Sequence, residues 1–446
     1  MKRTPFKQVA RILGSESLSE AVIQGVAVDS RLLRQGDLFL ALPGEKTDGH
    51  QFLSQAAERG ASGAVVSMDY QGDNFGLPLI RSRNVLGSLQ YLAKTTLQES
   101  DAYIVAVTGS LGKTTTKGFI SSLLKQKFKV TSSPGNSNSQ IGLPLTILNH
   151  VTFDEHVIVL EMGMTGPGHI TQLVEIAPPD IAVVTIVSMV HACYFDSIED
   201  IARAKGEIFS HPLTSLGIYH QDSDLDRALS SSGTCNKKSF STTSCNADFY
   251  LLADDQGLLV TERAGTSFRF SDLEVPGKHN HHNFLSAVAV AKSLGMSHEE
   301  IAFAQKTLEL PERRLQFIEK SGVLFINDAY NASALSIEAA LNALPEPPIG
   351  GRKIAVLGGI VELGKFSEEI HRAVGEYALN HVDCMFCFGE DCLPIFDCWQ
   401  SLKRPVVWAV DRQALLAALR KQLLPGDVVL LKGSHVKEVY KILDEL

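Results

Sequence analysis

Residues 103–116, YIVAVTGSLGKTTT, decide the fold. Residues 103–107 are a continuous apolar run, which is typical of a strand buried on both faces of a parallel sheet. A glycine-rich turn follows, and the amphipathic pattern of residues 119–126 predicts a helix after it. A strand, a glycine turn and a helix start direct backbone N–H groups to one point, where the helix dipole adds positive potential. The stretch therefore predicts a doubly wound α/β domain that binds phosphate groups.

The glycine turn departs from the strict phosphate-loop pattern, which requires a glycine five positions before Gly112, where Val107 stands. Small residues still occupy the positions that a phosphate must approach. We expect Lys113 to reach the outer phosphates of a nucleotide and the Thr114 hydroxyl to bind Mg²⁺. An ordinary glycine turn is the alternative, but strand, glycines, lysine and threonine occur together, which favours the phosphate loop. The residues expected to hold the nucleotide here are Gly109, Ser110, Leu111, Gly112, Lys113, Thr114 and Thr115.

The overall composition is that of a globular enzyme with several domains. The 446 residues are too many for one core, and 44% hydrophobic with 20% charged residues is an ordinary balance. A net charge of −9 argues against a nucleic-acid partner. Because no run of about 18 apolar residues occurs, and no apolar core follows the first residues, we expect neither a membrane span nor a signal peptide. Seven scattered cysteines suit a reducing cytoplasm.

Four of the cysteines lie close together in the sequence, at positions 384, 387, 392 and 398. A zinc site would need such ligands in a tetrahedral arrangement. However, residues 384–388, CMFCF, have the apolar pattern of a buried strand. We therefore expect buried, unreactive thiols rather than a metal site.

Alternating apolar runs and helical patterns divide the chain into three α/β units, residues 1–98, 99–310 and 311–446. A strand-rich excursion is expected at residues 214–275, and SHEE at residues 297–300 predicts a capping-box start of a helix. The strands expected are residues 26–30, 36–42, 64–66, 103–107, 157–160, 181–185, 323–326, 353–357, 385–388, 406–409 and 428–431. The clearest helices are residues 52–60, 119–126 and 367–380.

Polar side chains follow two further strands of the central unit. Glu161 ends one expected strand, and His191 lies just beyond another. Ligand groups gather at the carboxyl ends of parallel strands, so Glu161 is a candidate for a Mg²⁺ shell and His191 for binding or orienting a cation. A purely structural histidine is the alternative at position 191. Lys205 lies in a helical pattern, IARAKGEIF, for which spacing alone predicts a surface lysine.

The run GKHNHHN at residues 277–283 is dense in hydrogen-bonding side chains. Its three histidines do not predict a metal site, because neighbouring side chains at a helix start diverge. Asn280 and Asn283 are three residues apart and share one helix face. An amide pair on one face suits the edge of a nucleobase better than a metal.

These motifs, in this order and over nearly the whole chain, resemble the Mur ligases. The resemblance is carried by TGxxGKTT at 108–115, EMG at 161–163, His191, AKxE at 204–207, GxHNxxN at 277–283 and NDxYNA at 327–332. The chain is most similar to the members that join D-alanyl-D-alanine to a UDP-N-acetylmuramoyl tripeptide. Three segments favour that branch, namely NSNSQIGLPLT at 136–146, DAYNA at 328–332 and LGxxxELG at 357–364.

The resemblance implies a first domain for the UDP-sugar, a central ATP-binding domain and a Rossmann-like third domain for the incoming amino component. It implies Mg²⁺ at Thr114, Glu161 and His191. It also implies that Lys205 is carbamylated, and an anionic group there makes physical sense because Mg²⁺ would repel an ammonium. The implied catalytic residues are Lys113, Lys205 and His191. Further implied contacts are Asn280 and Asn283 with adenine, Arg314 and Asp328 with ATP, and Ser30, Arg31, Asn138, Tyr330 and Asn331 with the substrates.

Three runs depart from the family pattern. The family's Thr-Asn-Ile-Gly-x-Ala-His reads TIVSMVH at 185–191, its Asn-Ala-Asn-Pro-x-Ser reads NASALS at 331–336, and its Leu-Gly-Asp-Met reads LGGI at 357–360. The groups expected at metal, phosphate and adenine are retained. The altered runs border the acceptor side, so the sequence predicts the ATP chemistry more directly than the identity of the amine.

We therefore expect ATP to phosphorylate a substrate carboxylate and a dipeptide amine to attack the acyl phosphate, with closure of the third domain excluding water. The expected partners are UDP-N-acetylmuramoyl tripeptide and D-alanyl-D-alanine, and the expected state is a cytoplasmic monomer. One alternative is another Mur ligase or a folate–polyglutamate ligase, which UDP-sugar binding would distinguish. The other is a nucleotide-binding regulatory module without catalysis, which would bind ATP but release no phosphate.

Overall fold

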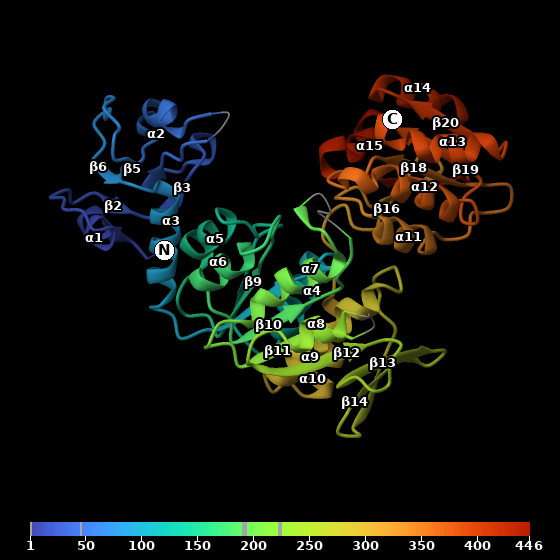
Figure 1. The fold of residues 1–446 in the computed structure, drawn as a ribbon, viewed down its shortest axis with the longest axis horizontal. Helices are drawn as coiled ribbons and strands as arrows, with labels where there is room; N and C mark the ends of the chain where they lie inside the picture. The colour runs from blue at the N-terminus through green and yellow to red at the C-terminus, as the bar shows by residue number, and fades with distance from the viewer. Residues whose placement is uncertain (1, 45–46, 190–193, 222–224) are drawn as a thin grey trace.

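The computed structural model describes residues 2–44, 47–189, 194–221 and 225–446, which fold around three main sheets (Figure 1). The four-stranded N-terminal sheet lies at the upper left of Figure 1, the nine-stranded central sheet below it, and the six-stranded C-terminal sheet at the upper right. Helices lie between most of the consecutive parallel strands. The three-part α/β architecture expected from the alternating pattern is confirmed. His191 lies outside the described residues.

The N-terminal sheet is parallel, in the order β3-β4-β5-β6. The strand expected at 26–30 is shorter, because the 3₁₀ turn η1 (Ser30–Leu32) begins where the Asp29 side chain accepts from the Arg31 N–H. Helix α3 (Val85–Leu97), capped by Asn84, leads toward the central sheet. The remaining elements are β1 (Thr4–Pro5), α1 (Phe6–Ile12), β2 (Val22–Ile23), β3 (Gly25–Ala27), β4 (Asp37–Leu40), η2 (Gly49–Phe52), α2 (Leu53–Glu58), β5 (Gly63–Ser67) and β6 (Leu79–Ser82).

The central sheet has the order β15-β14-β13-β12-β11-β10-β7-β9-β8. The strand-rich excursion expected within this unit at 214–275 is confirmed: β11, β12 and β13 continue the parallel sheet, while β14 and β15 form an antiparallel edge. The predicted capping box at Ser297 is confirmed. The strands are β7 (Tyr103–Thr108), β8 (Val130–Ser132), β9 (Val157–Glu161), β10 (Ile181–Val184), β11 (Leu216–His220), β12 (Asn236–Ser241), β13 (Phe249–Asp254), β14 (Gly257–Glu262) and β15 (Ser267–Phe270). The helices are α4 (Lys113–Leu124), α5 (Gly142–His150), α6 (His169–Ile176), α7 (Ile198–Gly206), α8 (Asp226–Ser230), α9 (Asn280–Ser293) and α10 (His298–Ala304).

The C-terminal sheet has the order β16-β17-β21-β18-β19-β20, and the five strands expected here are confirmed to within a residue or so. Strand β16, which was not predicted, pairs antiparallel with β17 at the edge. The strands are β16 (Gln316–Lys320), β17 (Val323–Asn327), β18 (Lys353–Gly358), β19 (Cys384–Phe388), β20 (Val406–Ala409) and β21 (Val428–Lys432). The helices are α11 (Ala334–Asn342), α12 (Ser367–Ala378), α13 (Leu393–Ser401), α14 (Arg412–Gln422) and α15 (Ile442–Glu445).

The cysteines of this part behave as expected of buried thiols. Cys384, Cys387 and Cys392 are buried, and Cys398 is half-buried. Burial raises the pKa of the Cys392 thiol to about 12, so that it stays protonated near neutral pH. A protonated thiol is neither a good nucleophile nor a good metal ligand.

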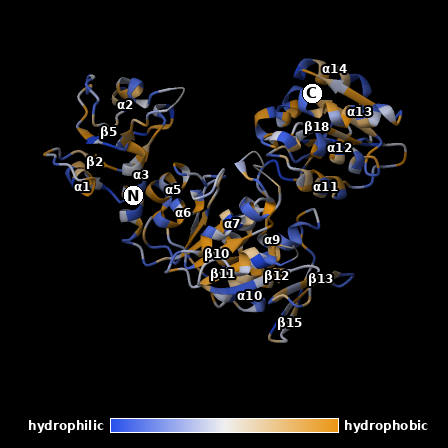
Figure 2. Ribbon diagram, in the orientation of Figure 1, coloured by the Kyte–Doolittle hydropathy of each residue, from blue (hydrophilic) through white to orange (hydrophobic). Residues whose placement is uncertain are grey.

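Apolar residues concentrate in the strands and in the helix faces that cover them (Figure 2). One hydrophobic cluster runs from the N-terminal sheet through α3 into α5, α6 and the adjoining face of the central sheet. The Asn149 amide of α5 adds a pair of hydrogen bonds, accepting from the Val26 N–H at 2.8 Å and donating to the Val26 carbonyl at 2.9 Å. The N-terminal part is therefore held on the central sheet by a shared core, whereas the C-terminal sheet is covered by clusters of its own.

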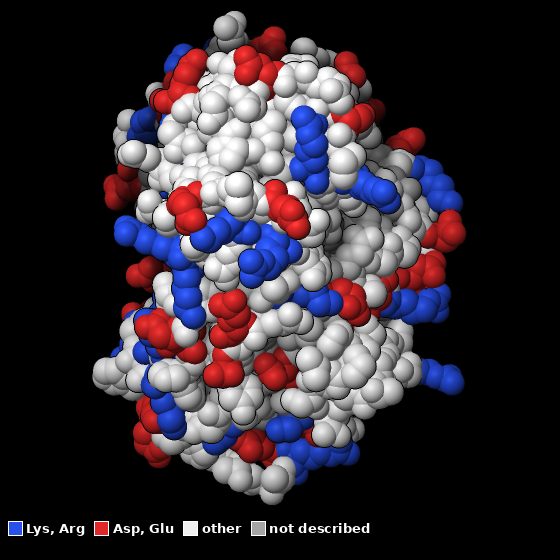
Figure 3. All heavy atoms as spheres, turned by 90° about the vertical axis from the view of Figure 1, so that its left-hand side faces the viewer, with Lys and Arg blue, Asp and Glu red and all other residues white. Residues whose placement is uncertain are grey.

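Within the described residues, no helix combines the length and the apolar character needed to cross a bilayer. The face turned to the viewer in Figure 3 carries basic and acidic side chains side by side. Opposite charges interspersed in this way give no large field of one sign over that face.

Candidate active site

The phosphate loop lies between β7 and α4 and depends on two glycines. Gly112 caps α4 with φ of 80° and no side-chain cap, so the first N–H groups of the helix remain available to an anion. Gly109 has φ of 149°, and a Cβ there would lie 1.8 Å from Thr185 Oγ1. At Gly112 a Cβ would lie 2.3 Å from Asn283 Oδ1. Only glycine fits both positions, which explains the spacing of the motif.

Lys113 folds back over this loop. Its Nζ donates to the carbonyls of Gly109 at 2.8 Å and Ser110 at 3.3 Å. Burial lowers the pKa of Lys113, and the Arg314 guanidinium lowers it further, whereas Glu161 opposes the shift. A phosphate placed on the loop would supply the negative charge that favours the ammonium.

The loop is braced by the segment that follows β10. The Ser110 N–H donates to the Ile186 carbonyl at 2.8 Å. The Ser110 hydroxyl donates to the Ser188 carbonyl at 3.0 Å and accepts from the Ser188 N–H at 3.0 Å. Ile186 stands where the family has asparagine, but it contacts the loop through its backbone. The departure at this position therefore leaves the support of the phosphate loop intact.

Glu161 lies at the carboxyl end of β9 within a buried polar network. Its Oε1 accepts from Asn138 Nδ2 at 2.7 Å, and its Oε2 lies 3.5 Å from Lys117 Nζ. Lys117 also donates to the carbonyls of Ser133, at 2.8 Å, and Gly135. Lys117 thus ties α4 to the loop that carries Asn138. Sequence reasoning missed this lysine, although its position one helix turn after Lys113 places it on the same face of α4.

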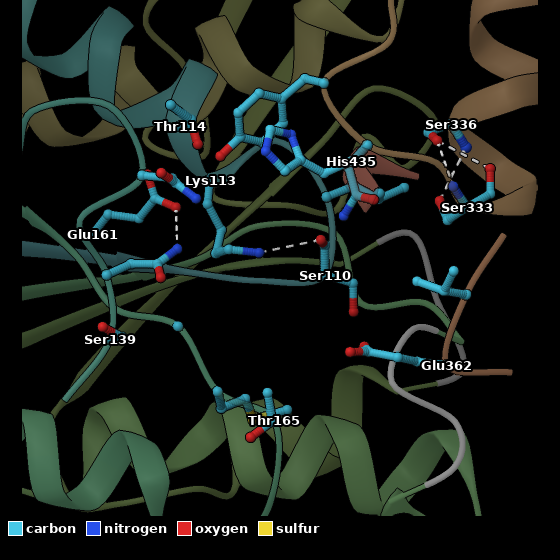
Figure 4. A pocket seen from close by; sticks show the side chains of 18 of the residues that line it. Ser110, Lys113, Thr114, Ser139, Glu161, Thr165, Ser333, Ser336, Glu362 and His435 are labelled. Atoms are coloured by element: carbon cyan, nitrogen blue, oxygen red, sulfur yellow. Dashed lines mark hydrogen bonds between the residues drawn. The ribbon is translucent and has the colours of Figure 1, made fainter. Parts of the chain in front are cut away.

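A cavity of about 600 Å³ brings the phosphate loop together with Leu86 of α3 and with segments that flank the strands of the C-terminal sheet. Figure 4 shows part of its lining, including Lys113, Glu161, Ser333 and His435. Of the predicted site residues, those that line it are Ser110, Leu111, Gly112, Lys113, Thr114, Asn138, Glu161, Arg314, Tyr330 and Asn331. Those that do not are Gly109, Thr115, Lys205, Asn280, Asn283, Asp328, Ser30 and Arg31. The cavity is therefore built mainly from the phosphate loop, the β9 end and the start of the C-terminal part.

The C-terminal contribution comes from the carboxyl ends of three neighbouring strands, β17, β21 and β18. Arg314 stacks over the Tyr330 ring at 4.4 Å, and its Nε has no hydrogen-bond partner in the described part of the chain. Asp328 accepts from the Leu315 N–H at 3.1 Å and forms a buried ion pair with Lys432. Asp328 thus anchors the segment that carries Arg314. Its predicted contact with ATP stays a prediction.

The amide pair of α9 lies directly behind the loop. Asn283 donates to Asn280 Oδ1 at 2.8 Å and accepts from Thr116 Oγ1 at 3.1 Å, while Asn280 donates to the Pro276 carbonyl at 2.7 Å. Both residues are buried. They share a face as expected, and their contact with adenine stays a prediction.

Lys205 is not the surface residue that its spacing predicts. It is 2% exposed on α7, and burial, together with the charge of Lys113, lowers its pKa well below the ordinary value. The helical pattern predicts that Lys205 lies on a helix, but it does not predict that this position of α7 is buried. In the N-terminal part, Ser30 is buried with its hydroxyl donating to Gln55 at 2.5 Å, whereas Arg31 is exposed and pairs with Asp29.

Two of the altered acceptor-side runs have a local structural explanation in this chain. Ser333 caps α11 in a capping box with Ser336, and serine is as good a helix cap as the asparagine it replaces. At Gly359 an added Cβ would lie 2.5 Å from Asp391 Cβ. The Asp391 side chain, paired with Lys437, therefore occupies the space into which the family's aspartate would project.

The residues fit a magnesium ion. The Thr114 hydroxyl and the Glu161 carboxylate line the same cavity, and Glu161 Oε2 has no hydrogen-bond partner in the described part of the chain. In the described part of the chain, no group of three or more His, Cys, Asp or Glu side chains could hold a metal by itself. Phosphate oxygens and water would complete the shell, as is usual for Mg²⁺.

A phosphate loop opening into a cavity between α/β units, with basic groups from the far side, defines a nucleotide-dependent enzyme of several domains. The chain matches the Mur ligase family, catalytic domain over residues 22–89, the Mur ligase middle domain over residues 107–291, and the Mur ligase, glutamate ligase domain over residues 313–435.

Full-length relatives agree. The UDP-N-acetylmuramoyl-tripeptide–D-alanyl-D-alanine ligase of Bacillus subtilis (strain 168) is 34% identical over 464 residues, which cover 100% of this chain and 98% of the relative. The crystal structure of the MurF ligase from Thermotoga maritima in complex with ADP superposes with a TM-score of 0.79 at 29% identity, over 94% of this chain and 96% of that one. The MurF of Acinetobacter baumannii superposes with a TM-score of 0.85 at 25% identity, over 100% and 99%. The chain belongs to the Mur ligase family, and within it to the MurF type.

Proposed function

We propose that this protein is an ATP-dependent, ADP-forming ligase that joins D-alanyl-D-alanine to UDP-N-acetylmuramoyl tripeptide during the synthesis of peptidoglycan precursors. The observation that carries the proposal is the single cavity that the phosphate loop shares with the strand ends of the C-terminal sheet. A nucleotide bound at the phosphate loop would have its outer phosphates in this cavity, which we propose also receives the two substrates. The 34% identity over the full chain to a ligase of this name supports the same conclusion.

The roles of the residues follow from their positions. When ATP binds, Lys113 Nζ leaves the loop carbonyls to which it now donates and binds the outer phosphates instead. Arg314 faces these phosphates from the C-terminal side of the cavity. Thr114 and Glu161 would hold a Mg²⁺ ion, which would neutralise part of the phosphate charge. The terminal carboxylate of the tripeptide attacks the γ-phosphorus and ADP leaves. The neutral amine of the dipeptide then attacks the acyl carbon, phosphate leaves, and the new amide nitrogen loses a proton to solvent. The walls of the cavity limit the access of water, which would otherwise hydrolyse that acyl phosphate.

We assign three functional units, residues 1–98 for the UDP-sugar, with Ser30 and Arg31, residues 99–310 for ATP, and residues 311–446 for the dipeptide. Asn138, Tyr330 and Asn331 line the cavity, and we assign them to the junction of the two substrates. We further infer a cytoplasmic monomer. The monomer is supported by the cavity, whose described lining comes from one chain and includes Leu86 of the N-terminal unit. Sedimentation of the protein with and without its substrates tests the monomer.

The ligase assignment is tested by incubating the protein with ATP, the UDP-muramoyl tripeptide and D-alanyl-D-alanine. We expect phosphate release that needs all three compounds, and a product whose mass equals tripeptide plus dipeptide minus water. Exchange of the UDP-substrate for a folate and of the dipeptide for glutamate should abolish both. Folded protein that binds ATP but yields no product would contradict the assignment.

We also propose that Lys205 is carbamylated, as the family resemblance implies. Burial lowers the pKa of Lys205 and so favours the neutral amine, whose nitrogen attacks the carbon of CO₂, forms an N–C bond and loses a proton. Lys205→Ala should lower turnover by about 10- to 100-fold, the usual cost of losing a group that supports a metal site. Bicarbonate should not restore it, whereas wild-type enzyme depleted of CO₂ should recover with bicarbonate.

The carbamate itself is detectable apart from activity. Protein incubated with ¹³C-bicarbonate should show a carbamate carbon signal by NMR that is missing in Lys205→Ala. Lys306→Ala, which removes an exposed lysine, should keep both the signal and full turnover. Full activity in Lys205→Ala would contradict a role for the modification.

A further inference from the structure

One wall of the cavity is formed by the loop of residues 133–141, which links β8 to α5. Leu86 of the N-terminal unit and Lys113 of the phosphate loop line the same cavity. The UDP-sugar is assigned to the N-terminal unit, and its peptide must reach the phosphate loop. The 133–141 loop is therefore a candidate surface for that peptide. Its residues on the cavity wall are Asn136, Asn138, Ser139, Gln140 and Ile141.

The end of the 133–141 loop nearest α5 is held by side chains from neighbouring helices. Gln140 Nε2 donates to the His169 carbonyl of α6 at 2.8 Å, and Gln90 Nε2 of α3 donates to the Gln140 carbonyl at 3.2 Å. Ser139 Oγ accepts from the Gly142 N–H at 3.0 Å, where α5 begins. This end of the loop is thus fixed to the elements that it joins.

The other end depends on one buried lysine of α4. Lys117 Nζ donates to the carbonyls of Ser133, at 2.8 Å, and Gly135, and it lies 3.5 Å from Glu161 Oε2. An ammonium group has three N–H donors, and these three oxygens account for them. Lys117 is 4% exposed and is not among the described residues that line the cavity. It can therefore act on a substrate only through the loop that it holds.

Glu161 shares in this arrangement but depends on Lys117 less than the loop does. Asn138 Nδ2 donates to Glu161 Oε1 at 2.7 Å, a bond drawn as a dashed line at Glu161 in Figure 4. Without Lys117, Glu161 would regain a cationic partner when Mg²⁺ binds beside it, because opposite charges at this separation attract strongly. The carbonyls of Ser133 and Gly135 would not regain a donor. Loss of Lys117 should therefore disturb the loop more than the nucleotide site.

We propose that Lys117 is a positioning residue for the tripeptide: by holding the start of the 133–141 loop, it fixes the wall against which the peptide part of the UDP-substrate binds. This rests on the proposed function. The same helix then carries the phosphate loop's Lys113 at its first position and, one turn later, the residue that shapes the peptide wall. Lys117 thus aligns the tripeptide carboxylate with the nucleotide phosphates.

The test measures ligand affinities by calorimetry in Lys117→Met, with the enzyme saturated with ADP and Mg²⁺. The affinity for UDP-muramoyl tripeptide should fall by about tenfold, because two charge-assisted hydrogen bonds that shape the wall are lost. The affinities for ADP and for the UDP-muramoyl sugar without a peptide should stay within about twofold. Lys125→Met, which replaces an exposed lysine at the end of α4, should match the wild type in all three.

Rescue and hydrogen exchange separate this role from a purely structural one. Lys117→Arg keeps the charge and the donors, so it should recover part of the lost affinity for the tripeptide substrate. In Lys117→Met the amides of residues 133–141 should exchange faster, whereas those of β9 and of the rest of α4 should not. In the wild type, UDP-muramoyl tripeptide should slow exchange in the 133–141 loop more than the sugar alone does.

Three results would overturn the inference while the wild type binds the tripeptide substrate. These are an unchanged affinity for that substrate in Lys117→Met, an equal loss of affinity for the sugar without a peptide, or no gain in wild-type affinity from the peptide. If Lys117→Met does not fold, Lys117→Gln, which keeps an uncharged donor, takes its place in the same comparison. Failure of the wild type to bind UDP-muramoyl tripeptide at all would instead contradict the proposed function.

Discussion

Replacement of Gly109 with alanine is expected to lower kcat/KM for ATP by at least about 100-fold, the usual effect of displacing reacting groups by about 1 Å. The φ of 149° at Gly109 is rarely adopted by alanine, and such strain costs about 1–3 kcal/mol. The new Cβ would also lie 1.8 Å from Thr185 Oγ1, a side chain held by the carbonyls of Leu111 and Thr108. The loop must move, and the N–H groups that face the phosphate move with it.

Gly118 provides the matched control, because it is also a glycine but lies within α4, which begins just after the loop that contains Gly109. No heavy atom lies within 4 Å of a Cβ built there. Gly118→Ala should leave turnover unchanged and raise the free energy of unfolding by about 0.5–1 kcal/mol, since alanine favours helix over glycine. ATP binding by calorimetry and thermal unfolding measure the two effects. Normal ATP binding in Gly109→Ala would show that the loop does not need its observed conformation.

The strands buried on both faces are the part of the fold that the sequence predicts best. The apolar runs of β7 and β19 have few competing interpretations, because a solvent-facing strand would alternate. The phosphate loop is also local, since its glycines, lysine and threonine lie within one turn between a strand and a helix. Such features depend on residues that are neighbours in the chain.

Features that depend on distant segments could not be predicted. The pairing of β12 with β13 and the antiparallel edge beyond it follow from which strands meet, not from any pattern in the excursion. The burial of Lys205 and the contacts of Lys117 with a loop 16–18 residues away have the same origin. The altered run at Ser333 could be interpreted only after its capping role was visible.

The pair Lys432–Asp328 offers the second large effect. Lys432 is 2% exposed at the end of β21, and its Nζ donates to Asp328 and to the carbonyl of Asn331 at 3.1 Å. Burial lowers the pKa of Lys432, while the Asp328 carboxylate opposes the shift. Lys432→Met would leave a buried carboxylate without its cation, which typically costs about 3–5 kcal/mol.

We expect Lys432→Met to lose that stability and most of its ligase activity. The loop that contains Asp328 also carries Tyr330 and Asn331 of the cavity wall. The Asp328 carboxylate accepts from the Leu315 N–H and so holds the segment that carries Arg314. Hydrogen exchange of β17, β18 and β21 measures the local free energy of opening. The double variant Lys432→Met/Asp328→Asn removes both charges and should recover most of the stability, as neutral replacements of buried pairs often do.

Activity should not recover to the same extent, because the donor that held the Asn331 carbonyl is still missing. Equal recovery of stability and activity would show that the pair serves the fold alone. If the double variant is as unstable as Lys432→Met, the cost arises from lost packing of the lysine stem rather than from an unpaired charge. A stable, inactive double variant would instead assign the pair to the active site, and Asp328→Asn alone then separates the predicted ATP contact of Asp328 from the positioning of the strand ends by Lys432.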